Sequence, residues 1–280
     1  MKIGQIRKQN KVMAAIFEGN LARPIQNYGT IELIEKAEKE SVELTEIALS
    51  LAAKEFEDAK KIIPIEPDEV WACGCSYQVS AQWRDAEYGT REGFYAAVYR
   101  NQRPELFFKG TARVCTGPGN YIGLRADSNF TAPEPELAVV VGSNGKVFGY
   151  TIGNDVSAWD IERENPLYLP QSKIFDGCAA LGPVIVTADE IKDPYNLEIS
   201  CTIERNGEII FNDKSTTQKL TRKIEEMINF LLRSNKIPPG TVLMTGTGII
   251  IPAESALKPG DIVKIRIPEI GELTNVAKIV

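Results

Sequence analysis

The segment Ala-Pro-Glu-Pro-Glu-Leu-Ala-Val-Val-Val-Gly (residues 132–142) joins two acidic side chains to a short, valine-rich run. The run at 137–141 has the length and composition of a buried strand. Side chains alternate along a strand, so Glu134 and Glu136 would share a face, roughly 6–7 Å apart. At an effective dielectric of about 20, two such charges repel by roughly 2–3 kcal/mol. Either the strand begins in water, where this repulsion is weak, or a cation lies beside the pair.

The overall composition is that of a globular chain. Its 280 residues are 43% hydrophobic and 25% charged, enough for one large domain or two smaller ones. The net charge of −6 gives no indication of a nucleic-acid partner or an anionic membrane surface. No apolar run reaches the roughly 18 residues of a membrane span, and the N-terminal stretch lacks the apolar core of a signal peptide. We therefore expect a cytoplasmic protein without nucleic-acid or membrane partners.

The chain contains no histidine. This excludes catalytic triads of the Ser-His-Asp or Cys-His kind and any histidine-ligated metal. The five cysteines are odd in number and form no CxxC pair, which favours buried free thiols over disulfides or a zinc site. Proton transfer would fall to Glu, Asp, Lys, Tyr or Cys. A bound metal would take oxygen ligands, which magnesium, manganese and calcium prefer.

The pattern of segments predicts a mixed α+β fold dominated by strands, because the regular βαβ alternation of a doubly wound sheet is absent. The stretch KKIIPIEP (60–67) has two prolines and is typical of a linker. It predicts a small N-terminal domain over residues 1–66 and a larger domain over residues 67–280. Within the larger domain, helical spacing of apolar residues predicts helices over 79–100 and about 217–235.

A third acidic residue, Asp155, follows the predicted strand at 146–152 closely. The Asn-Gly pair before that strand predicts a tight hairpin turn, which would fold it back antiparallel on the first strand. The end of the second strand then lies beside the start of the first, which brings Asp155 to Glu134 and Glu136. Three carboxylates at one point repel strongly unless a divalent cation lies among them. With the cation they form a hard-metal site that leaves positions for water and substrate.

An ordered set of motifs resembles the fumarylacetoacetate hydrolase family. That family carries E-x-E on a strand, followed by N-D-V-S-A-R-D, and this chain has PEPELAVVVG followed by GNDVSAWD. Further matches occur in order: GCSY (74–77), FFKG (107–110), FDGCAALGP (175–183), MTGTG (244–248), LKPGDIVKI (257–265) and GELTNV (271–276). The resemblance covers roughly residues 70–280 and implies a β-roll or sandwich with a small N-terminal domain. Three segments are similar to the sugar-acid dehydratases of the family: RPELFFK, APEPELAVV and ENPLYLPQSK.

The resemblance also implies roles for individual residues of this chain. It assigns a magnesium ion, with manganese or calcium as alternatives, to three carboxylates: Glu134, Glu136 and Asp155. It implies Lys173 and Glu105 as the catalytic acid–base pair, without deciding which is the acid. It implies substrate contacts for a set of polar side chains: Ser76, Tyr77, Lys109 and Thr247.

Each of these assignments has a simpler alternative in the sequence itself. Glu105 can form a structural salt bridge with Arg103, because charges at strand ends often pair. Lys173 can be an ordinary surface lysine. Tyr77 can be a core tyrosine with a satisfied hydroxyl group.

The implied activity is magnesium-dependent dehydration of a 2-keto-3-deoxy sugar acid, a pentonate, to 2,5-dioxopentanoate by a homodimer or homotetramer. Two residues depart from the family pattern. Ser80 stands where the family's hydrolases have a histidine, which argues against cleavage of acylpyruvates. Trp159 stands in place of the arginine of S-A-R-D. The alternatives are hydrolysis of an acylpyruvate, decarboxylation or isomerisation of a 2-oxo acid, and non-catalytic binding by the same fold.

Overall fold

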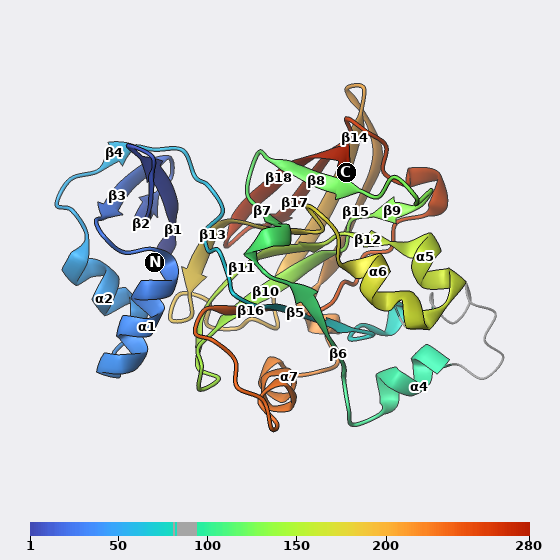
Figure 1. Cartoon of the computed structure of the whole chain (residues 1–280), viewed down its shortest axis with the longest axis horizontal. Coiled ribbons are helices and arrows are strands. Elements are labelled where there is room, and N and C mark those ends of the chain that lie inside the picture. Colours follow the sequence, from blue (N-terminus) through green and yellow to red (C-terminus); the bar gives the residue numbers. More distant parts are fainter. Residues whose placement is uncertain (81, 83–93) are drawn as a thin grey trace.

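The computed structural model describes residues 1–80, 82 and 94–280 and is dominated by strands (Figure 1). The expected mixed α+β class is confirmed. The first part of the chain, which we call the N-terminal lobe, forms β1 (Lys2–Lys8), β2 (Lys11–Glu18), β3 (Leu21–Ile25), α1 (Thr30–Glu40), α2 (Leu44–Leu51) and β4 (Glu57–Asp58). Figure 1 shows this lobe in blue at one end of the molecule.

A large sheet runs through the whole molecule in the order β4-β3-β2-β1-β13-β11-β10-β16-β5-β6, with β7 also paired to β13. Its strands beyond the lobe are β5 (Val70–Gly74), β6 (Glu105–Gly110), β7 (Cys115–Thr116), β10 (Pro135–Val141), β11 (Val147–Asp155), β13 (Ala179–Thr187) and β16 (Thr241–Met244). The lobe joins this sheet where Lys2 and Ile3 of β1 pair with β13. The segment 59–69 has no helix or strand. A domain boundary near residue 66 stays a prediction.

A second sheet packs over the middle of the large one, against β10, β11 and β13. Its order is β15-β14-β17-β18-β8. The strands are β8 (Tyr121–Leu124), β14 (Glu198–Arg205), β15 (Glu208–Thr216), β17 (Ile262–Ile267) and β18 (Gly271–Ile279). Every residue of β10 is buried, so both faces of this strand are shielded from solvent. This burial explains the unbroken valine run, since a strand covered on both faces needs no polar side.

The remaining elements belong to neither of these two sheets. They are the short pair β9 (Thr131–Ala132) and β12 (Ser157–Ala158) and the helices α4 (Phe94–Arg100), α5 (Trp159–Glu164), α6 (Leu169–Lys173) and α7 (Ile224–Leu231). Single 3₁₀ turns occur at Ala112–Val114, Pro166–Tyr168, Thr217–Lys219 and Ala253–Ser255. Figure 1 shows α5 and α6 side by side, close to β12.

The two predicted helices of the larger domain are only partly found. Of the helix expected over 79–100, α4 is present, and most of the remaining stretch lies outside the described residues. The helix expected over about 217–235 is confirmed only in its middle, because α7 spans Ile224–Leu231. Before it, Leu220 forms a β-bridge with Tyr77, and Thr221 donates two hydrogen bonds to the carbonyl of Ser76. These long-range contacts replace the helical hydrogen bonds of that stretch.

Candidate metal centre

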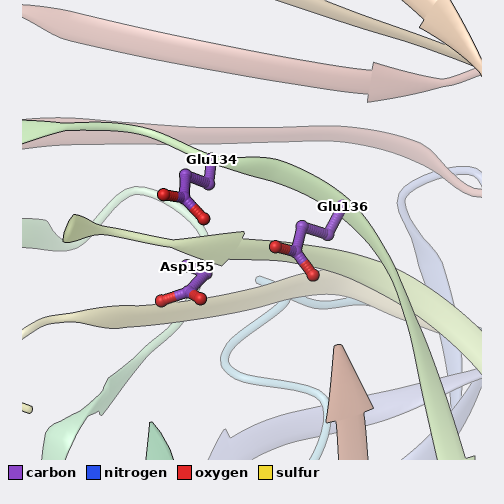
Figure 2. Close-up of side chains that lie close together, drawn as sticks. All are labelled: Glu134, Glu136 and Asp155. Atoms are coloured by element: carbon purple, nitrogen blue, oxygen red, sulfur yellow. The ribbon is translucent and has the colours of Figure 1, made fainter. Parts of the chain in front are cut away.

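The hairpin predicted from the Asn-Gly turn is present and builds the centre. Strands β10 and β11 pair antiparallel with Glu136 opposite Gly153, and the Asp155 backbone N–H donates to the Glu134 carbonyl at 3.0 Å. The carboxylates of Glu134, Glu136 and Asp155 each offer one oxygen within 4.8 Å of the others. Figure 2 shows the three side chains gathered at the ends of these strands. All three are at most 5% exposed, so the alternative of a strand that simply begins in water is wrong.

Protein donors hold each of these carboxylates. Glu136 Oε2 accepts a hydrogen bond from the backbone N–H of Gly246 at 2.5 Å. Glu134 Oε1 accepts from the indole Nε1 of Trp159 at 2.6 Å and from Lys173 Nζ at 2.9 Å. Asp155 lies between two ammonium groups, with Lys109 Nζ 2.5 Å from Oδ1 and Lys173 Nζ 3.4 Å from Oδ2. The donors fix the orientation of the carboxylates around their shared centre.

The electrostatics of the centre favour a cation. Burial raises the pKa of Glu136 well above its ordinary value, and the neighbouring charges of Asp155 and Glu134 raise it further. The Gly246 N–H and the Lys173 ammonium oppose this shift only in part. A divalent cation would favour the ionised form instead, because metal binding requires deprotonated ligands. Buried oxygen donors from three carboxylates therefore fit a hard dication such as magnesium.

Lys173 lies at the end of α6 and is 1% exposed, which excludes the alternative of a surface lysine. Besides Glu134 and Asp155, its ammonium donates to Ser157 Oγ at 2.6 Å and lies 3.9 Å from Glu162 Oε2. The ring of Phe107 lies 5.6 Å from Nζ. Lys173 therefore touches two of the three candidate metal ligands.

Strand β6 presents alternate residues to the centre, because side chains two apart share a face. Phe107 lies near Lys173, and Lys109 ion-pairs with Asp155. The Lys109 ammonium also donates to the carbonyls of Val156, at 2.9 Å, and Lys173, at 2.5 Å. Two backbone carbonyls and an ion-paired carboxylate thus surround this ammonium, which suits a positioning role better than the expected contact with substrate.

A cavity of about 460 Å³ adjoins this side of the fold, with Glu105 and Glu162 in its wall. Glu105 is half-buried at the start of β6, on the same face as Phe107 and Lys109. Glu162 is buried and connects the cavity with Lys173 through their 3.9 Å contact. The sequence interpretation missed Glu162, which lies just beyond the quoted GNDVSAWD motif. The sequence feature that could have identified it is its spacing from Trp159. Glu162 follows Trp159 by one helical turn, so the two side chains lie on the same face of α5.

The other expected substrate residues gather at one turn, TGTG (245–248). Ser76 Oγ donates to the carbonyl of Thr245 at 2.6 Å and packs against Gly246, the residue whose N–H holds Glu136. Thr247 is buried, and its hydroxyl bonds within the turn to the carbonyl of Ile249 at 3.3 Å.

Tyr77 lies against Gly248 of the same turn. Its buried hydroxyl has no hydrogen-bond partner among the described residues. Burial, with a smaller contribution from the Glu136 charge, raises the pKa of this phenol. A buried hydroxyl without a protein partner does not fit the alternative of a satisfied core tyrosine.

The described residues contain no helix long and apolar enough to cross a membrane. Comparison with known proteins gives a consistent result over most of the chain. The family described as Fumarylacetoacetate (FAA) hydrolase C-terminal matches residues 70–278. The chain is 50% identical over 231 residues to the 2-dehydro-3-deoxy-D-arabinonate dehydratase of Saccharolobus solfataricus, covering 81% of this chain and 78% of that protein.

Two further relatives agree with this match. A probable 2-keto-3-deoxyxylonate dehydratase of Haloferax volcanii is 43% identical over 235 residues, covering 84% of this chain and 80% of the relative. A solved structure of 2-keto-3-deoxy-D-arabinonate dehydratase, complexed with magnesium and 2,5-dioxopentanoate, superimposes with a TM-score of 0.84 at 41% identity, covering 100% of this chain and 99% of that one. The chain therefore belongs to the fumarylacetoacetate hydrolase family.

Proposed function

We propose that this protein is a magnesium-dependent dehydratase that converts a 2-keto-3-deoxy pentonate to 2,5-dioxopentanoate. The observation that carries the proposal is the buried set of Glu134, Glu136 and Asp155, whose oxygens lie within 4.8 Å of one another. The dehydratase relatives, and the magnesium and 2,5-dioxopentanoate in one of their structures, support the choice of metal and substrate. The proposal includes a homodimer or homotetramer, which the sequence resemblance implies, and a cytoplasmic location, which the sequence pattern leads us to expect.

The three carboxylates would hold the magnesium ion, and manganese or calcium would suit the same oxygen donors. When bound, the cation supplies a Lewis acid for the carboxylate and keto oxygens of a 2-oxo acid. Lys109 would keep Asp155 in place through their 2.5 Å ion pair. Gly246 would do the same for Glu136 through its backbone N–H.

Dehydration needs one group that removes a proton from C3 and one that gives a proton to the departing C4 hydroxyl. Lys173 and Glu105 would share these transfers, with Lys173 at the carboxylates and Glu105 in the cavity wall. Loss of water leaves an unsaturated 5-hydroxy-2-oxo acid, and its tautomerisation places the second carbonyl at C5. Thr247 in the TGTG turn and Tyr77, which packs against that turn, would contact the substrate, and Ser76 would hold the turn.

The lack of histidine argues against the hydrolytic alternative. At the position of the hydrolase histidine, this chain has Ser80, which is 8% exposed. A serine hydroxyl is too weak a base to activate water at neutral pH by itself. Dehydration needs no activated water, so the residues present suffice for it.

A product analysis tests the proposal directly. The chelator-treated protein is incubated with and without magnesium, together with a panel of 2-keto-3-deoxy acids and 2,4-diketo acids, and the products are identified by mass spectrometry. We expect magnesium-dependent loss of water from a 2-keto-3-deoxy pentonate, with formation of 2,5-dioxopentanoate. Rapid cleavage of an acylpyruvate to pyruvate without any dehydration would favour the hydrolase. Tight binding without turnover of any compound would favour a non-catalytic binder.

A further inference from the structure

Trp159 occupies a fixed position beside the metal centre. It begins α5 and is 4% exposed. Its ring packs edge-to-face against Phe130 with centroids 5.2 Å apart, and its backbone N–H donates to the Phe130 carbonyl at 2.9 Å. The ring and the backbone are thus both held by Phe130. The indole Nε1 then donates to Glu134 Oε1 at 2.6 Å.

Glu134 Oε1 is held by two donors of different kinds. Lys173 Nζ donates to the same oxygen at 2.9 Å and is a cation, whereas the indole is neutral. Hydrogen bonds to an ionised acceptor are the stronger ones, and two of them from different directions oppose rotation of the carboxylate. The bond from Trp159 therefore contributes to the orientation in which Glu134 faces the other two carboxylates.

The charges around the centre match a divalent cation. The buried ionisable groups here, among the residues that the structure describes, are four carboxylates and two ammonium groups: Glu134, Glu136, Asp155, Glu162, Lys109 and Lys173. When all are ionised, negative charges exceed positive ones by two, which a dication neutralises. A positively charged donor at position 159 would leave the metal-loaded cluster with an excess positive charge in a buried site, where charges interact strongly.

We propose that Trp159 is a positioning residue for the metal: it orients Glu134 by a hydrogen bond that adds no charge, and so sets the affinity for the divalent cation. The inference rests on the metal site of the proposed function and deepens it. It gives a physical role to the departure from the family's arginine. Partners of metal ligands that act in this way typically change metal affinity by about 10- to 100-fold when they are removed.

The test compares magnesium affinities, measured by titration calorimetry on the chelator-treated full chain. Trp159→Phe keeps an aromatic ring and removes the N–H. Trp159→Arg keeps N–H donors and adds a charge. The matched control is Trp71→Phe, because Trp71 Nε1 also donates to a carboxylate, Glu69 Oε2, at 2.8 Å, but outside the metal centre. Thermal unfolding of each metal-free variant checks that it folds.

We expect magnesium to bind about tenfold or more weakly to Trp159→Phe, and at least as weakly to Trp159→Arg despite its donors. The Trp71→Phe control should bind like the wild type. Wild-type affinity in Trp159→Phe would overturn the positioning role. Weak binding by Trp159→Phe with wild-type affinity in Trp159→Arg would overturn the requirement for a neutral donor. Failure of the wild type to bind magnesium would instead overturn the metal site itself, and this inference with it.

A second experiment observes Trp159 in the wild-type protein, so it does not depend on the folding of any variant at position 159. The chain has three tryptophans, so its indole N–H groups give three resonances in a ¹H–¹⁵N spectrum, and Phe substitutions at the other two positions assign that of Trp159 by elimination. Addition of magnesium to the wild type should shift the Trp159 resonance and leave the Trp71 resonance in place. An unchanged Trp159 resonance at magnesium saturation would contradict the contact with a metal ligand.

Discussion

At the scale of single residues, the two buried lysines of the centre have different surroundings. Lys109 is engaged by Asp155 and by two backbone carbonyls, so its ammonium links the strand that carries Asp155 to the end of α6. The polar contacts of Lys173 described above are with side chains, those of Glu134, Asp155, Ser157 and Glu162. An ammonium held by backbone carbonyls suits positioning, and one that lies among carboxylate side chains suits proton transfer.

Substitution of Lys173 should separate chemistry from metal binding. Lys173→Met keeps the length of the side chain and removes the ammonium, so the acid–base step loses one member while the three carboxylates remain. We expect turnover to fall by at least about 10²-fold, the usual range for such a group. Magnesium binding by calorimetry should persist. Full dehydratase activity in this variant would show that Lys173 is not part of the chemistry.

Substitution of Glu136 should have opposite effects with and without metal. The pKa of Glu136 is raised in the folded protein, so its contribution to stability is present below the ordinary carboxyl pKa and is lost as pH rises through the raised value. Glu136→Gln removes the ionisable group, so the loss of stability that accompanies its ionisation disappears. The amide oxygen can still accept a hydrogen bond from the Gly246 N–H. The metal-free variant should therefore be as stable as the wild type or more so at neutral pH, with a flatter dependence on pH.

With magnesium present, Glu136→Gln should show no turnover and little stabilisation, because a ligand that binds only the folded state stabilises it by an amount that grows with the logarithm of its affinity. Urea unfolding between about pH 5 and pH 8, with chelator and with magnesium, measures both effects. A variant that is fully active after chelation and magnesium repletion would refute the assignment of Glu136 as a ligand.

At the scale of elements, local sequence patterns were enough to predict the carboxylate cluster of the metal centre. Contacts between segments far apart in the sequence could not be predicted in this way. The β10–β11 hairpin followed from the Asn-Gly turn and from alternation along the strands, so three carboxylates could be placed together from sequence. The contacts of Trp159 and Glu162 depend on how α5 docks, and the contacts of Lys109 depend on β6 lying beside β5. Helix α7 started late for the same reason, since Leu220 and its neighbours pair with the Ser76–Tyr77 segment.

The TGTG turn gives a prediction at this scale. Gly246 has a φ of +95°, and a Cβ there would lie 1.9 Å from Ser76 Oγ and 2.8 Å from the carbonyl of Cys73. Gly246→Ala should displace the turn, withdraw its N–H from Glu136 and weaken magnesium binding by about tenfold or more. Gly260→Ala is the matched control, because Gly260 has a φ of +89° with nothing within 4 Å of the added Cβ.

The control should carry only the backbone cost of a positive φ, about 1–2 kcal/mol of unfolding free energy, and bind magnesium like the wild type. Calorimetry and urea unfolding of both variants make the comparison. Equal magnesium affinities in Gly246→Ala and Gly260→Ala would mean that the turn does not support Glu136.

At the scale of the whole molecule, one connection between the N-terminal lobe and the site runs through strand β13. Strand β1 pairs with β13, and the other end of β13 pairs with Asp155 through Ala179. The resemblance covered only the chain from about residue 70, so no motif could predict that the lobe continues the large sheet. The carboxylate cluster and the cavity are both built from residues beyond the lobe.

We therefore expect the lobe to support the fold without taking part in the chemistry. Lys8 and Glu57 form an exposed ion pair at 2.6 Å, and such pairs contribute about 0–1 kcal/mol. Lys8→Ala should leave both kcat and stability close to wild type.

Ile3→Ala removes a fully buried side chain at the junction with β13, and should lower the free energy of unfolding by about 2–5 kcal/mol. The position of Asp155 is fixed by its contacts with β10, Lys109 and Lys173. The fraction of this variant that remains folded should therefore keep its kcat. Activity normalised to the folded fraction, read from circular dichroism at the assay temperature, tests this separation. A fall in normalised kcat in either variant, at unchanged folded fraction, would mean that the lobe acts on the site through β13.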